Sequence, residues 1–68
     1  MRYTLDIREH NNGRWRATVL EMPGVTATGD SPDQAGAKVQ ARILHRLADD
    51  VERGKVTGLV SVTFAAMA

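Results

Sequence analysis

The stretch Trp15–Ala35, WRATVLEMPGVTATGDSPDQA, decides the fold. Residues Trp15–Leu20 alternate with a period of two, which is typical of a strand whose two faces differ. Pro23 lacks a backbone donor and Gly24 tolerates positive φ, so the Met-Pro-Gly tripeptide predicts a break between strands, not strand interior. Val25–Thr28 is short and rich in β-branched residues, and we expect it to be the third strand.

A helix is expected to begin directly after this third strand. Ser31 can accept a hydrogen bond from the first helical turn, and Pro32 suits the first helical position. Gln34 completes a capping box with Ser31. Asp30 and Asp33 place negative charge at the positive end of the helix dipole. These cues agree on one helix start.

The remaining strands lie on either side of this stretch. Arg2–Glu9 alternates as a first strand, and Asn12-Gly13 predicts a tight hairpin to the second. Leu59–Ala65 is expected to be the fourth strand. A right-handed crossover through the helix places this strand parallel to the first strand and beside it. The predicted spatial order of the strands is therefore 3-2-1-4.

The predicted helix runs from Pro32 to about Arg53, with Gly54 as its C-terminal cap. Its apolar residues share one arc: Gly36, Ala37, Val39, Ile43, Leu44, Leu47 and Val51. Gly36 suggests a close backbone approach to a strand. The predicted class is α+β, a two-layer β-β-β-α-β domain with a mixed four-stranded sheet and one helix on one face.

Composition limits the class of protein. The chain has 68 residues, no cysteine and a net charge of +1. We expect one domain over residues 1–68, too small to be robust alone and without disulfides to support it, so a homo-oligomer (dimer or tetramer) is the expected support. We find no signal-peptide pattern and no apolar run near the ~20 residues that a membrane span needs, so a cytoplasmic, non-membrane protein is expected.

The end of the chain carries no charge from Val56 to Ala68. Exposed edge strands are normally protected by charge or proline, and the fourth strand is predicted to be an edge. We therefore interpret it as a surface that pairs with another chain; the alternatives are a covering loop or a frayed tail. The candidate oligomer interface is Leu59, Val60, Ser61, Val62, Thr63 and Phe64.

Several motifs, taken in their order along the chain, resemble those of the HicB-like family. This family includes the antitoxins of HicA–HicB pairs. The matching positions cover the first three strands and the helix start: Tyr3-x-Leu5-x-Ile7, Trp15-x-Ala17-x-Val19-x-Glu21-Met22-Pro23-Gly24-Val25, Thr28-Gly29-Asp30-Ser31 and Gln34-Ala35. The Pro-Gly corner followed by Gly-Asp-Ser and a capped helix is the most specific part.

The resemblance implies a partial RNase H-like fold, association as dimers or larger, and no nuclease activity. It also implies binding to a small RNA-cleaving toxin. Such antitoxins usually carry a C-terminal DNA-binding domain. Here the sequence ends after the predicted fourth strand, so we expect a stand-alone member without operator binding.

The residues themselves also favour a non-enzymatic protein. An RNase H site needs converging carboxylates to hold two metal ions, and Asp6 has no partner of the same kind on the neighbouring strands. His10 and His45 lie in different elements and do not have ligand spacing. Ser31 has no neighbouring base and is interpreted as a cap. No catalytic residue, metal or cofactor is expected.

The sheet face opposite the helix is predicted to be rich in Arg and Thr: Arg2, Thr4, Asp6, Arg8, Arg16, Thr18, Leu20, Thr26, Thr28, Ser61 and Thr63. We expect this face to contact a protein partner, with Arg2, Arg8, Arg16, Thr18 and Leu20 as candidates. The alternative is a small RNA- or DNA-binding protein that uses Arg2, Arg8, Arg14 and Arg16. However, binding of single strands usually needs stacking aromatics, and the aromatic side chains have the parity of the buried face.

Overall fold

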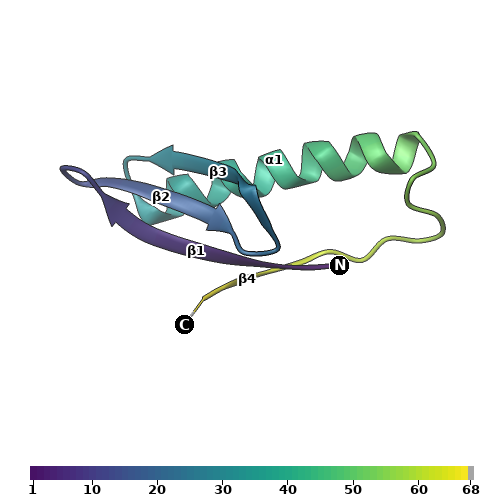
Figure 1. Cartoon of the computed structure of the whole chain (residues 1–68), viewed down its shortest axis with the longest axis horizontal. Helices are drawn as coiled ribbons and strands as arrows, with labels where there is room; N and C mark the ends of the chain where they lie inside the picture. The colour runs from purple at the N-terminus through teal and green to yellow at the C-terminus, as the bar shows by residue number, and fades with distance from the viewer. Residues whose placement is uncertain (68) are drawn as a thin grey trace.

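The computed structural model describes residues 1–67. The chain forms a sheet with one helix packed on one face (Figure 1). The elements are β1 (Arg2–His10), β2 (Arg14–Val19), β3 (Met22–Gly29), α1 (Pro32–Glu52) and β4 (Thr63–Ala66). The strand order is β3-β2-β1-β4. β1 pairs antiparallel with β2 and parallel with β4, and β2 pairs antiparallel with β3. The predicted fold class and strand order are confirmed.

The β1–β2 hairpin forms as its turn residues require. Asn11, Asn12 and Gly13 all have positive φ, at 49°, 54° and 83°. The N–H of Arg14 donates to the carbonyl of Asn11 (3.1 Å) and closes the turn. Asn and Gly are the residues that adopt these left-handed conformations at least cost, which explains the sequence at this position.

The prediction that Met-Pro-Gly separates two strands is wrong. The chain turns at Leu20 and Glu21, and β3 already begins at Met22. Met22 pairs with Val19, whereas Thr26 pairs with Thr18, so residues 23–25 bulge from the ladder. β3 is an edge strand, and proline is tolerated at edges and bulges, where its missing donor is not needed.

The predicted fourth strand, Leu59–Ala65, is also partly wrong. β4 covers only Thr63–Ala66, and its pairing begins with Thr63 opposite Arg2. β1 itself begins at Arg2, so no strand lies beside residues 59–62. These residues form an irregular connection to α1, and the Met1 ammonium donates to the carbonyl of Ser61 there.

The predicted start of α1 is confirmed. The Ser31 hydroxyl accepts a hydrogen bond from the N–H of Gln34 (3.0 Å). The Gln34 side chain accepts from the N–H of Asp30 (2.6 Å), one residue earlier than in the usual capping box. At the other end Gly54 has φ of 75° and its N–H donates to the carbonyl of Val51, as expected of a C-terminal cap.

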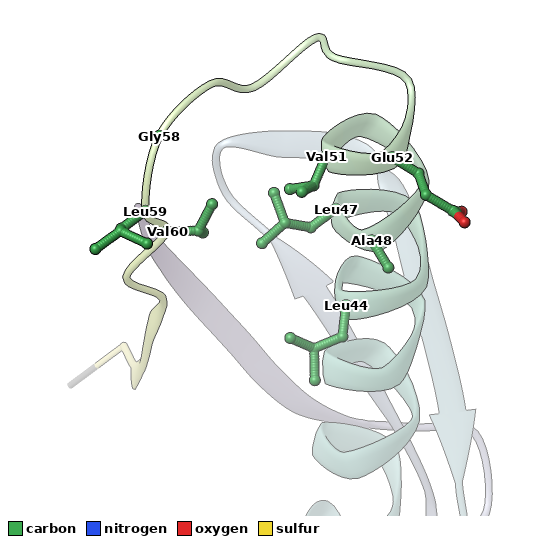
Figure 2. A pocket seen from close by; sticks show the side chains of 8 residues that line it. All are labelled: Leu44, Leu47, Ala48, Val51, Glu52, Gly58, Leu59 and Val60. Carbon is green, nitrogen blue, oxygen red and sulfur yellow. The ribbon is translucent and has the colours of Figure 1, made fainter.

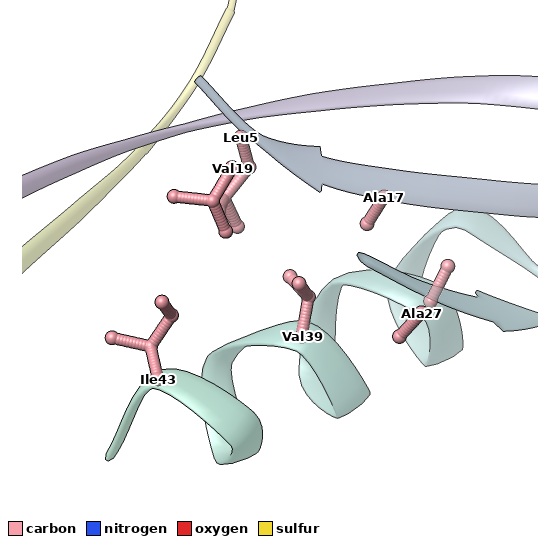
Figure 3. Packing of buried hydrophobic residues seen from close by; sticks show 7 residues of the cluster. Leu5, Ala17, Val19, Ala27, Val39 and Ile43 are labelled. Carbon is pink, nitrogen blue, oxygen red and sulfur yellow. The ribbon is translucent and has the colours of Figure 1, made fainter. Parts of the chain in front are cut away.

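The core lies between α1 and the strands β1, β2 and β3 (Figure 3). It consists of small and branched side chains: Leu5, Ala17, Val19, Ala27, Ala35, Val39 and Ile43. The C-terminal half of α1 extends beyond β2 and β3 (Figure 1). Leu44 and Val51, which were predicted to belong to the buried arc, are 46% and 40% exposed, whereas Ile43 and Leu47 on the same helix are buried. The close neighbour of Gly36 is the side chain of Ile7, not a strand backbone.

Candidate functional site

Within residues 1–67, no strand pairs with the outer edge of β4. The N–H groups of Thr63 and Met67 donate to the carbonyls of Met1 and Leu5, both at 2.8 Å, on the β1 side. Backbone groups alternate in direction along a strand, so Phe64 and Ala66 direct their N–H and C=O groups to the outer edge. No charged side chain lies within this strand. The edge is therefore open to another strand.

The predicted oligomer interface is divided between two places. Thr63 and Phe64 lie in β4, with Phe64 half-buried against the core cluster. Leu59, Val60, Ser61 and Val62 precede the strand, and Leu59 is fully exposed. The structure thus does not bring all six residues to a single strand edge.

An apolar groove lies between the C-terminal half of α1 and this connection (Figure 2). Its volume is about 750 Å³, and its lining is Leu44, Leu47, Ala48, Val51, Glu52, Gly58, Leu59 and Val60. Leu44, Leu47 and Val51 point from the helix toward the connection, which carries Leu59 and Val60 (Figure 2). This groove was not predicted from the sequence, because Leu44 and Val51 have the spacing of core residues.

The open face of the sheet carries the predicted arginines, and several have polar partners. Arg8 pairs with Asp6 (2.9 Å), as expected for Asp6, and Arg14 pairs with Asp30. A guanidinium nitrogen of Arg16 lies 3.1 Å from Nε2 of His10. Arg8 and Arg16 are directly opposite across β1 and β2, so two like charges share this part of the face.

The other predicted members of this face lie at different places along it, with Thr18 opposite Asp6. Thr18 is half-buried in β2, whereas Leu20 lies in the β2–β3 turn and is 46% exposed. Arg2 lies at the start of β1, opposite Thr63. Ser61 is outside the sheet, so its predicted place on this face is wrong.

The aromatic side chains lie on the helix side of the sheet, as their parity predicted. Tyr3, Trp15 and Phe64 pack against the core cluster. Tyr3 and Phe64 stack on each other across β1 and β4, with ring centroids 5.8 Å apart. These rings are therefore not placed beside the arginines of the open face, where a base would need them.

Glu21 has a structural role that the sequence analysis missed. Its carboxylate accepts hydrogen bonds from the backbone N–H of Thr4 (2.7 Å) and from the Thr4 hydroxyl (2.9 Å). The bond from the Thr4 N–H is the main reason that the pKa of Glu21 falls below its ordinary value of 4.5. Glu21 thus ties the β2–β3 turn to β1. The position of Glu21 directly before Met-Pro-Gly was the sequence feature that could have indicated this role.

Residues 1–67 contain no group of three or more His, Asp or Glu side chains arranged to hold a metal ion. Across the same residues, no helix combines the length and the apolar character that a bilayer crossing requires.

Comparison with known proteins found no match among family models, curated protein sequences or solved structures.

Proposed function

We propose that this chain is a non-enzymatic protein-interaction module, acting in the cytoplasm, and that the outer edge of β4 is its principal binding surface. There a strand of another polypeptide extends the sheet by main-chain hydrogen bonds. The observation that carries the proposal is the open edge itself: Phe64 and Ala66 direct backbone groups outward from a strand without charge or proline.

A second copy of the chain is the first partner that this edge fits. Two identical edges can pair antiparallel around a two-fold axis, because such an interface is self-complementary. Ala65 and Ala66 have small side chains, and Ala66 is exposed, so no bulky group at these positions obstructs a neighbouring strand. Pairing would also offset the small core of the single chain.

The resemblance to HicB-like antitoxins supports a second partner, a small RNA-cleaving toxin that the module masks. An antitoxin of this kind should be encoded beside a small basic protein, and co-expression of the two proteins tests this part. A stable complex that loses its RNA cleavage is expected. Absence of such a neighbour, or a neighbour that does not bind, would contradict the antitoxin role and leave the strand-pairing role standing.

Nucleic-acid binding by Arg2, Arg8, Arg14 and Arg16 has weaker support. Arg8 and Arg14 already pair with carboxylates, and the aromatic rings lie on the other side of the sheet. Binding of an RNA or DNA oligonucleotide whose affinity falls steeply with salt would favour this alternative.

Two proline variants test the edge. In Ala66→Pro the lost N–H points outward, so the ladder to β1 should persist while pairing with another chain is blocked. Ala65→Pro is the matched control, because the N–H of Ala65 points toward β1 and its loss should destabilise the fold. Light scattering at micromolar concentration should show that Ala66→Pro forms a smaller assembly than the wild type, with an unchanged circular dichroism spectrum. An assembly of unchanged size would overturn the proposal.

A further inference from the structure

The groove beside the C-terminal half of α1 leaves large apolar side chains in solvent. Leu44 and Val51 are 46% and 40% exposed, and Leu59 on the opposite wall is fully exposed. Leu44 and Val51 belong to α1, which packs chiefly over β3, β2 and β1, and Leu59 precedes β4 and is not one of its strand residues. The groove is thus a second surface, distinct from the strand edge.

We propose that a second copy of this chain occupies the groove, with the two α1 helices packed antiparallel. The inference deepens the proposed function, because it adds a second contact between copies of the same module.

The spacing along α1 is that of a helix–helix contact. Exposed apolar residues recur at intervals of four and three: Ala37, Ala41, Leu44, Ala48 and Val51. Such a repeat keeps one stripe facing a neighbouring helix. The stripe extends over about 21 Å at 1.5 Å per residue. Its alanines allow the two helix axes to approach closely, and Leu44 and Val51 supply most of the apolar surface.

The charged side chains beside this stripe favour a second copy of the chain as the partner, and they favour an antiparallel orientation of the two helices. Lys38, His45 and Glu52 follow at seven-residue intervals along one side, and all three are exposed. When two copies pack antiparallel around residue 45, Lys38 of each lies near Glu52 of the other. A parallel pair would instead bring residues of the same number together, Lys38 with Lys38 and Glu52 with Glu52. The chain is therefore complementary to itself in the antiparallel arrangement.

Charge exchange tests this arrangement directly. Lys38→Glu and Glu52→Lys each create two repulsive pairs in the symmetric contact, and each should weaken self-association roughly 3- to 10-fold. The double variant Lys38→Glu/Glu52→Lys restores both pairs with the signs exchanged, and its dissociation constant should return to within about 3-fold of wild type. A double variant no tighter than the single variants would overturn the antiparallel contact.

Leu44→Glu tests whether the groove is an interface at all. A buried charge at the centre of the contact should weaken it by more than roughly 30-fold. Arg42→Glu is the matched control, because Arg42 is exposed on the same helix but lies outside the stripe. Analytical ultracentrifugation should show a smaller assembly for Leu44→Glu only, with circular dichroism confirming that both variants fold.

The two interfaces can be separated in one series. Two isologous contacts on one chain generate a tetramer, so Ala66→Pro and Leu44→Glu should each give a dimer and their combination a monomer. A monomeric Ala66→Pro variant, or a Leu44→Glu variant that keeps the wild-type assembly, would overturn the groove contact. An Ala66→Pro variant that keeps the wild-type assembly would instead overturn the proposed pairing at the outer edge of β4.

Discussion

At residue 29 the space available to the side chain is smaller than a methyl group. A Cβ added to Gly29 would lie 2.7 Å from the backbone nitrogen of Ala35 and 2.9 Å from Oε1 of Gln34. Both atoms belong to the first turn of α1, and both already take part in the hydrogen bonds of the helix start. Gly29 therefore sets how closely the end of β3 approaches the helix.

We expect Gly29→Ala to lower the free energy of unfolding by about 1–3 kcal/mol, because the helix start must move away from β3. Urea denaturation followed by circular dichroism measures the change. Gly24→Ala is the matched control, since no heavy atom lies within 4 Å of its added Cβ. That variant should stay within about 0.5 kcal/mol of wild type. Equal effects of the two substitutions would contradict the role given to Gly29.

Glu21 makes a pH-dependent contribution to stability. Its pKa is lowered in the folded state, chiefly by the hydrogen bond from the Thr4 N–H, so the contribution is present above the ordinary value of 4.5. It is lost as the pH falls through the lowered pKa of the folded state. Glu21→Gln should therefore unfold at a lower urea concentration than wild type near pH 7. The difference should close in strong acid; a difference that is independent of pH would show that charge is not the cause.

At the scale of the elements, α1 depends on its cap. Ser31→Ala removes the acceptor for the Gln34 N–H, and about 1 kcal/mol of stability should be lost. Ser31→Asn keeps an acceptor in a residue that caps equally well, and it should remain close to wild type in thermal denaturation. If both variants have the same melting temperature, the hydroxyl is not the group that stabilises the helix start.

The elements that could be predicted from sequence are those whose signals are local. Ser31, Pro32 and Gln34 specify the helix start by their own chemistry, and Asn12-Gly13 specifies the hairpin. The start of β4 at Thr63 could not be predicted this way, because it depends on where β1 begins. The continuation of β3 through Pro23 depends likewise on the edge position of β3, where a bulge is tolerated.

The same distinction between local and long-range signals applies to the candidate site. The edge position of β4 came from chain topology and strand counting, and it is confirmed. The groove could not be predicted in this way. Leu44 and Val51 have the period of a buried helix face whether or not a sheet lies beneath them. Their exposure depends on which part of that arc the sheet covers: Ile43 and Leu47 are buried, whereas Leu44 and Val51 on its flank are exposed.

For the molecule as a whole, the shape leaves little interior. The principal extents are 43, 21 and 17 Å, so much of the chain lies near the surface. The buried hydrophobic side chains are all Ala, Val, Leu or Ile, and most of them lie where α1 covers β1, β2 and β3. The other end, with the groove, has large apolar groups in solvent. Association is the means by which this end can be buried.

Stability should therefore depend on protein concentration. Assembly favours the folded chain by mass action, so the melting temperature should rise as the concentration is raised from micromolar to hundreds of micromolar. The Ala66→Pro/Leu44→Glu variant should melt at one temperature throughout this range, below the wild type. Arg42→Glu should retain the dependence, because it removes neither interface. A wild-type melting temperature that does not change with concentration would mean that the single chain is stable by its own core, and that neither the strand edge nor the groove contributes to folding.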